Sequence, residues 1–317
     1  MPEYEVAHLS AENIEDAVEV IRRSREEVPF ERAPTVGELR ADTLRDTEFR
    51  PEASWVVKDG GACVAFAIAT LDPNRVSAGL DDVQYDFDIV PEARGRGLEQ
   101  RLLGLASGYT TSRGVGKLRA RCVAEEPWRK AFLESEGFAE TYRVFFLVRR
   151  GRGAIADVPA PDGIRLVRRP YKDCDDEEMT RIAEAFNDTF QDHYNFAPER
   201  PERFIQFRDA SEDPETFSLG MAGDEIVGVC LSHEDRTYNI ANGTKWGWIN
   251  ILGVRPPYRR RGLGRFLLAD GMKWVLEQGM DTTYIGVYAK NEKALDMYLS
   301  TGFVKDRESM WFEKRLR

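Results

Sequence analysis

Histidine and cysteine are scarce in this chain, and their scarcity argues against several kinds of site. The 317 residues include three histidines and four cysteines. Three histidines are too few for a multi-histidine metal site and leave few candidates for a Ser-His-Asp triad. The cysteines lack CxxC spacing, which argues against a zinc site and a disulfide framework. They are Cys63, Cys122, Cys174 and Cys230. We therefore expect no metal and a reducing, cytoplasmic environment.

Long apolar runs and an excess of positive charge are also missing. No stretch approaches the length of about 18 apolar residues that a membrane-spanning helix needs. The acidic, patterned segment 1–20 does not predict a signal peptide. The 45 Lys and Arg are outnumbered by 55 Asp and Glu, which gives a formal net charge of −10. These features predict a soluble globular protein with neither a nucleic-acid nor a membrane partner.

The chain contains an internal repeat. The segment "ARGRGLEQRLL" (93–103) matches "YRRRGLGRFLL" (258–268) at a shift of 165 residues. The same shift relates "SEGF" (135–138) to "STGF" (300–303). A period of this length indicates two copies of one domain and not a solenoid.

Each copy has the same predicted order of elements, and Gly and Pro spaced through 151–162 predict a linker between domains 1–150 and 163–317. A strand, a helix and a hairpin precede a strand that enters the arginine-glycine segment. A long helix, another strand, a helix and a terminal hairpin follow. This pattern predicts an α/β fold class, with a mixed sheet and flanking helices in each copy. The expected segments are 4–9, 11–27, 54–70, 83–90 and 117–123 in the first copy, and 163–169, 176–190, 216–232, 246–254 and 282–289 in the second.

The arginine-glycine segment has the features of an anion site. A glycine turn between a strand and a helix leaves unpaired N–H groups at the helix N-terminus, where phosphate can bind. Gly262 and Gly264 have no Cβ to keep an anion away. Arginines 259–261 and Arg265 add positive charge. The alternatives are an ordinary strand–turn–helix with solvated arginines, or a nucleic-acid contact, which the acidic chain disfavours.

Two motifs together resemble those of the GNAT N-acetyltransferase superfamily. Arg259-x-x-Gly262-x-Gly264 is similar to its acyl-CoA pyrophosphate loop, and "NEKALDMYLSTGF" (291–303) is similar to its second signature. The resemblance covers 163–317 well and 1–150 with eroded motifs. Two fused copies resemble tandem acetyltransferases of the mycothiol synthase type, although no residue identifies that substrate.

The resemblance implies a role for each matched residue. The strand before the loop is expected to splay from its neighbour and bind pantetheine through its backbone, and the Val254 N–H to act as an oxyanion donor. Tyr298 matches the general acid that protonates the departing thiolate, although a half-buried aromatic of the core is the alternative. Asn291 either caps a helix or contacts the cofactor. The implied acetyl-CoA site comprises Ile251, Leu252, Gly253, Val254, Arg259, Arg260, Arg261, Gly262, Leu263, Gly264, Arg265 and Asn291.

The general base and the acceptor cleft are less well defined. Many relatives carry a glutamate on the splayed strand, but the best-fitting position here is Asn250, whose amide cannot accept a proton. Other base candidates, each with a structural alternative, are His233, Glu234, Asp235 and the loop 191–196; an ordered water relay would also suffice. Aromatic residues suggest a partly apolar acceptor cleft, unless they belong to the core: Tyr194, Phe196, Trp246 and Trp248.

The first copy differs at the positions that carry the chemistry. At the 165-residue shift, Gly264, Tyr298 and Asn291 correspond to Glu99, Leu133 and Glu126. A glutamate in the loop would repel pyrophosphate. We therefore interpret the first domain as degenerate and non-catalytic, and Asp86 and Asp88 on its matching strand as surface charges.

The sequence as a whole predicts an acetyl-CoA-dependent N-acetyltransferase that is active in its C-terminal domain. The acceptor would be a primary amine of a small molecule or peptide, and the protein a monomer or homodimer. A non-catalytic acyl-CoA sensor is the alternative.

Overall fold

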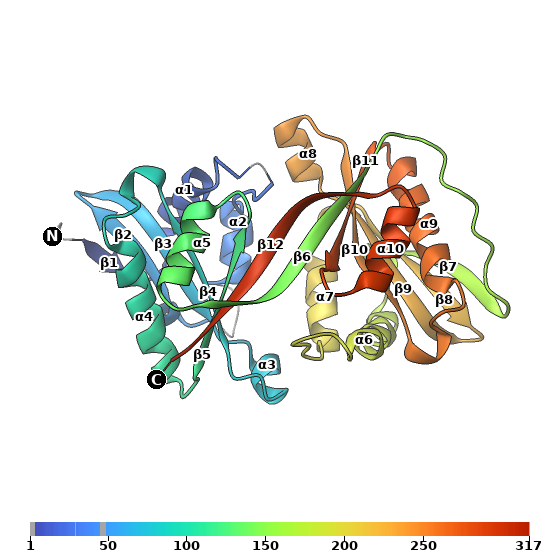
Figure 1. Ribbon diagram of the computed structural model, residues 1–317, viewed down its shortest axis with the longest axis horizontal. Helices are drawn as coiled ribbons and strands as arrows, with labels where there is room; N and C mark the ends of the chain where they lie inside the picture. The colour runs from blue at the N-terminus through green and yellow to red at the C-terminus, as the bar shows by residue number, and fades with distance from the viewer. Residues whose placement is uncertain (1–3, 29, 45–48, 317) are drawn as a thin grey trace. The chain divides into compact units, whose positions relative to one another are not determined.

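The computed structural model describes residues 4–28, 30–44 and 49–316, which fall into two compact units (Figure 1). The first unit comprises Met1–Arg143 and Ser309–Arg317, and the second comprises Val144–Glu308. The predicted linker 151–162, which carries no helix or strand, lies within the second unit. Within the described residues, no helix is long and apolar enough to cross a membrane. All four cysteines have free thiols.

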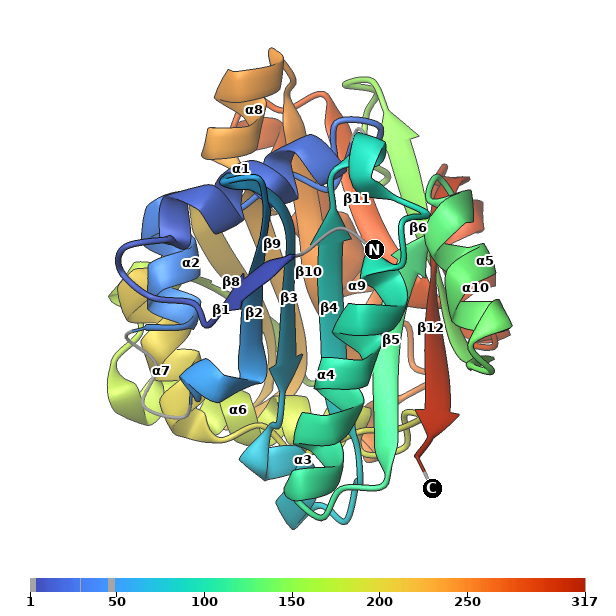
Figure 2. The ribbon, with the colours of Figure 1, turned by 90° about the vertical axis from the view of Figure 1, so that its left-hand side faces the viewer.

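The described residues of the first unit form a mixed sheet in the order β1-β2-β3-β4-β5-β12, in which only the β4–β5 pair is parallel. Figure 2 looks onto this unit, with α4 in front of the strands. Its strands are β1 (Glu5–Ala7), β2 (Ser54–Asp59), β3 (Ala62–Thr70), β4 (Val83–Ile89), β5 (Lys117–Val123) and part of β12 (Val304–Arg315). Its helices are α1 (Ile14–Ser24), α2 (Val36–Asp42), α3 (Pro73–Ser77), α4 (Leu98–Ser112) and α5 (Pro127–Ser135), with 3-10 turns η1 (Pro51–Ala53) and η2 (Pro91–Ala93).

The second unit repeats this arrangement, in the order β7-β8-β9-β10-β11-β6 with β10 and β11 parallel. Its strands are β7 (Ile164–Pro170), β8 (Glu215–Ala222), β9 (Glu225–Glu234), β10 (Trp246–Val254), β11 (Thr282–Tyr288) and part of β6 (Ala139–Arg150). Its helices are α6 (Asp176–Phe190), α7 (Pro201–Ala210), α8 (Arg236–Asn242), α9 (Leu263–Glu277) and α10 (Glu292–Ser300), with 3-10 turns η3 (Tyr171–Asp173) and η4 (Pro256–Tyr258). The mixed α/β fold class predicted from the sequence is confirmed.

The two halves of the chain exchange their last strands. In the first unit, β12 pairs with β5, with Arg315 opposite Lys117. In the second unit, β6 pairs with β11, with Arg150 opposite Thr282. These two pairs are related by the 165-residue shift, so the two pairings have the same register. The predicted terminal hairpins are wrong, because each is a single strand of 12 residues.

Local sequence explains where α6 begins and which face it buries. Asp175 caps α6 by accepting from the Glu178 N–H, and Glu178 completes the capping box. The apolar residues of α6 then recur at helical spacing and enter a core with α7, β8 and β9. A second core cluster contains α9, α10 and the facing residues of β9, β10 and β11.

Candidate active site

Strand β10 is paired along its full length on one side only. Its pairing with β9 extends to Val254 opposite Gly228, whereas its parallel pairing with β11 ends at Ile249 opposite Ile285. Within the described residues, 250–254 therefore have no partner strand on the β11 side. Such an edge presents backbone N–H and C=O groups that an extended ligand can bind like an added strand.

Two local features shape this free edge. A β-bulge between Ile249 and Ile251 leaves Asn250 as the extra, exposed residue. Gly253 lets α6 approach the strand closely, because a Cβ there would lie only 2.0 Å from Thr189 Cγ2. The glycine is therefore required by packing.

The loop after β10 leads into a helix end that no side chain of the described chain caps. Arg260 and Gly262 adopt left-handed backbone conformations, with φ of 63° and 86°, and Gly262 is the N-cap of α9. The first N–H groups of α9 thus point outward without a capping side chain, as an anion site requires. At Gly264, a Cβ would meet Met297 Sδ at 3.7 Å, which is ordinary van der Waals contact.

The arginines of this loop have different surroundings. The Arg259 guanidinium, whose predicted phosphate contact remains a prediction, binds the carbonyl oxygens of Val254 (3.0 Å) and Thr189 (2.8 Å) and the carboxylate of Asp192 (2.9 Å). Arg260, Arg261 and Arg265 are exposed. Arg261 lies over the ring of Tyr258, and Arg265 donates to Ser300 Oγ at 2.8 Å. The positive charge at the loop surface therefore comes from these three residues.

Helix α10 carries the residues of the second motif. Asn291 Oδ1 accepts from the Ala294 N–H at 3.2 Å, so the capping alternative describes its contact in this structure. Tyr298 is 5% exposed and packs in the core with Phe303. Burial raises the pKa of the Tyr298 phenol, and the Cys230 thiol raises it further. Tyr298 belongs to the core cluster against which Leu252 and Val254 of the free segment of β10 pack.

The base candidates have protein partners of their own. Asp235 caps α8 by accepting from the Tyr238 N–H at 2.8 Å. The Glu234 carboxylate lies 3.4 Å from Arg236 Nε. His233 Nε2 lies 3.4 Å from Asp213 Oδ2. These contacts give each candidate a structural role.

In the 191–196 loop, Asp192 binds Arg259, and the His193 ring meets the edge of Phe190 with centroids 4.8 Å apart. The position on β10 at which a base was sought carries the Asn250 amide and no carboxylate.

Most of the aromatic residues predicted to line an acceptor cleft pack against other aromatic side chains. Trp246 and Trp248 both contact Tyr284, with centroids 5.0 and 4.9 Å apart. Phe196 is half-buried, with its centroid 6.3 Å from Phe186. Tyr194, at 47% exposure, keeps a large accessible surface.

The first unit has the same backbone but different side chains. Leu133, at the position of Tyr298, is fully buried and offers no proton. Asp88 was interpreted as a surface charge, and this is wrong, because it is 2% exposed and ion-paired with Arg25. Among the described residues, no cluster of His, Cys, Asp and Glu could hold a metal ion.

Comparison with known proteins agrees with this geometry. The family described as "Acetyltransferase (GNAT) family" matches residues 179–303. The mycothiol acetyltransferase of Acidothermus cellulolyticus is 30% identical over 236 residues, which are 71% of this chain and 69% of the relative. That of Frankia alni is 27% identical over 322 residues, or 93% and 89% of the two chains.

A solved tandem GNAT protein from the clavulanic acid biosynthesis pathway has the same fold, with a TM-score of 0.75, 18% identity and coverage of 99% of this chain and 98% of the other. The repeat, the free edge of β10, the uncapped loop and these relatives lead to one conclusion. The chain belongs to the GNAT acetyltransferase family and carries two GNAT units in tandem.

Proposed function

We propose that the second unit binds acetyl-CoA and transfers its acetyl group to a primary amine of a small molecule or peptide. The observation that supports this most strongly is the free edge at 250–254, which leads directly into the uncapped N-terminus of α9. An extended pantetheine arm and a pyrophosphate need these two features in this order. The transfer would occur in the reducing cytoplasm, in a monomer or homodimer.

The backbone of this unit would hold the donor. Residues Ile251–Val254 would bind pantetheine as an added strand, with the Val254 N–H directed at the thioester carbonyl oxygen. The first N–H groups of α9, from Leu263 and Gly264, would bind the pyrophosphate together with Arg260, Arg261 and Arg265. Acetyl-CoA supplies the activated acyl group, so no covalent enzyme intermediate is needed.

Two side chains would handle protons. Tyr298 would protonate the departing thiolate, because burial raises its pKa above the ordinary phenol value of about 10 and so keeps the hydroxyl protonated. Asn250 cannot take a proton, and we assign its exposed amide to holding a water that accepts the proton of the acceptor amine. Asn291 would serve this site as the cap that starts α10.

The acceptor class follows from the relatives. Because they are named mycothiol acetyltransferases, a mycothiol-related amine is the first acceptor to test. Exposed Tyr194 in the 191–196 loop would form one wall of the acceptor cleft.

A non-catalytic acyl-CoA sensor is the second candidate, favoured by the absence of a carboxylate at the Asn250 position among the described residues. Free-thiol release from acetyl-CoA, measured across a panel of primary amines, separates the two. An N-acetyltransferase releases one thiol per acetylated amine. Tight acetyl-CoA binding with no release across the whole panel would favour the sensor.

A further inference from the structure

The first unit retains the backbone of the anion-binding loop. Gly95 and Gly97 have φ of 73° and 85°, matching 63° at Arg260 and 86° at Gly262 in the second unit. Gly97 begins α4 as Gly262 begins α9, and no side chain of the described residues caps either N-cap position. The conformation that aims N–H groups at a phosphoryl group is therefore present in both units.

In the first unit this loop binds one of the protein's own carboxylates. Glu99 Oε1 accepts a hydrogen bond from the Gly95 N–H at 2.7 Å. The side chain is 5% exposed, and its Oε2 hydrogen-bonds no group in the described part of the chain. A carboxylate at a helix N-terminus is favoured by the helix dipole, as a phosphate would be. Glu99 thus lies where the second unit, with Gly264, has no side chain.

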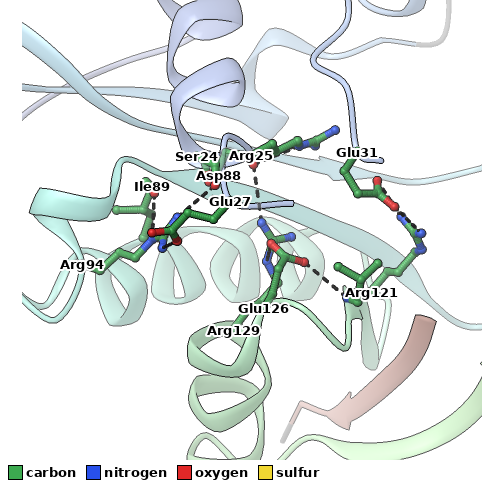
Figure 3. A network of polar contacts seen from close by, with 11 residues as sticks. Ser24, Arg25, Glu27, Glu31, Asp88, Ile89, Arg94, Arg121, Glu126 and Arg129 are labelled. Atoms are coloured by element: carbon green, nitrogen blue, oxygen red, sulfur yellow. Dashed lines mark hydrogen bonds and ion pairs between the residues drawn. The ribbon is translucent and has the colours of Figure 1, made fainter. Parts of the chain in front are cut away.

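Charged side chains also form a buried network beside this loop. Within the described residues, β4 pairs with β5 at Val83 and Gln84 alone, so its later residues have no partner on the β5 side, as in β10. Asp88, on this unpaired part of β4, binds Arg25 Nη2 at 3.0 Å and lies 3.5 Å from Arg129 Nη2. Figure 3 shows Arg129 extending from α5 toward Asp88.

Two members of this network, Glu126 and Arg129, belong to the N-cap and the first turn of α5. Arg129 Nε lies 3.0 Å from Glu126 Oε1. The side chains of Asp88, Glu126 and Arg129 are all less than 10% exposed. The 165-residue shift places small or neutral residues at these positions in the second unit: Gly253, Asn291 and Ala294.

We propose that Glu99 is a built-in anion that occupies a phosphate-binding loop of the first unit, and that shortening this side chain opens a site for a pyrophosphate group there. The Asp88–Arg129–Glu126 network lies beside the unpaired part of β4 and keeps the rest of a CoA molecule from binding there. The first unit is therefore a GNAT unit whose ligand positions are filled by its own side chains. This inference concerns a different loop from the proposed transferase site and does not depend on acetyl transfer.

The test uses the full chain labelled with ¹⁵N-glycine and titrated with inorganic pyrophosphate. In Glu99→Ala, the Gly95 and Gly97 amide signals should shift saturably, with an affinity at least tenfold higher than in the wild type. Glu99→Gln is the matched control, because its amide oxygen can still accept from the Gly95 N–H. It should respond no more than the wild type.

Several outcomes would overturn the proposal. If the Gly95 and Gly97 signals of folded Glu99→Ala do not move, the loop is not a preformed anion site. If those of the wild type move as much as those of the variant, Glu99 does not occupy it. Should Glu99→Ala fail to fold, Glu99→Gly, which copies Gly264, takes its place; failure of both would mean that Glu99 is needed for folding and would overturn the proposal.

Acetyl-CoA binding provides an independent test. Calorimetry should find the same number of acetyl-CoA sites in Glu99→Ala as in the wild type, and an additional site would contradict the role of the Asp88–Arg129–Glu126 network. Because the glycine signals report on the first unit, their result is separable from any failure of acetyl transfer in the second.

Discussion

Arg259 links the end of β10 to α6. Its Nε donates to the Val254 carbonyl oxygen at 3.0 Å, and its Nη2 donates to the Thr189 carbonyl oxygen at 2.8 Å. Arg94 does the same in the first unit, to Ile89 at 3.1 Å and Ser24 at 2.9 Å. The first unit keeps these contacts although Glu99 occupies its loop. The shared arginine therefore holds strand to helix, and its role does not require a phosphate.

Replacing either arginine should therefore cost stability. Arg259→Gln and Arg94→Gln should each lower the free energy of unfolding by about 2 kcal/mol, the scale of hydrogen bonds made by a charged group. Arg260→Ala is the control: this exposed side chain should leave stability nearly unchanged and weaken acetyl-CoA binding. Urea unfolding and calorimetry measure both effects. An unchanged stability in Arg94→Gln would contradict the shared role.

Tyr298 should matter to turnover more than to binding. Tyr298→Phe keeps the buried ring and removes the hydroxyl, so kcat should fall by about 10²-fold, the scale of a lost general acid. Acetyl-CoA affinity should stay within twofold of wild type. Tyr284→Phe removes a hydroxyl elsewhere in the same unit and should leave kcat unchanged. Wild-type turnover in Tyr298→Phe would show that Tyr298 is not the general acid.

The pH dependence of turnover follows from the raised pKa of Tyr298. A general acid must carry its proton, and activity falls as the pH rises through its pKa. Because burial raises that pKa above the ordinary value of about 10, the alkaline limb should lie at higher pH. With saturating substrates, kcat should rise as the acceptor amine deprotonates and show no decline up to about pH 10. A decline below pH 9 in the wild type that is absent in Tyr298→Phe would show that the pKa of Tyr298 is not raised.

The strand exchange predicts that a residue near one end of the chain stabilises the unit formed mainly by the other half. Phe312 is fully buried in the core of the first unit, and Leu147, its equivalent, in that of the second. Phe312→Ala should destabilise the first unit by about 3–5 kcal/mol, and Leu147→Ala the second by about 2–5 kcal/mol.

Hydrogen exchange can locate each loss. Phe312→Ala should speed amide exchange in β2–β5, and Leu147→Ala in β8–β11. If Phe312→Ala speeds amide exchange only in residues 163–308, β12 does not stabilise the first unit and the exchange of strands is wrong.

Sequence periodicity predicted the main strands and helices of each unit, because their apolar patterns are local, but it missed α2, α3, α7 and α8 and placed a terminal hairpin where each unit has a single strand. It could not predict the exchange of β6 and β12. These strands are equivalent under the 165-residue shift, so exchanged and unexchanged pairings bring similar residues opposite β5 and β11. Local pattern does not distinguish two pairings with the same register.

The candidate site, too, was only partly predictable from the sequence. The glycine loop and the capping residue Asn291 could be predicted because their conformations need particular residue types. The role of Arg259 could not, because its main partners are backbone carbonyl oxygens, which carry no sequence signal. Asp88 was taken for a surface charge because its partner Arg25 is distant in sequence.

Acetyl-CoA binding to Gly264→Glu, measured by calorimetry, tests the central claim most directly. This variant copies Glu99 into the second unit and should fold, since the first unit accommodates glutamate at the same position. Its carboxylate would occupy the N-terminus of α9, so acetyl-CoA affinity should fall at least tenfold and acetyl transfer with it. Gly264→Ala, whose methyl group has room beside Met297, should retain most of the binding. Wild-type affinity in folded Gly264→Glu would show that this loop does not bind the pyrophosphate, and the proposed acetyl-CoA site would be wrong.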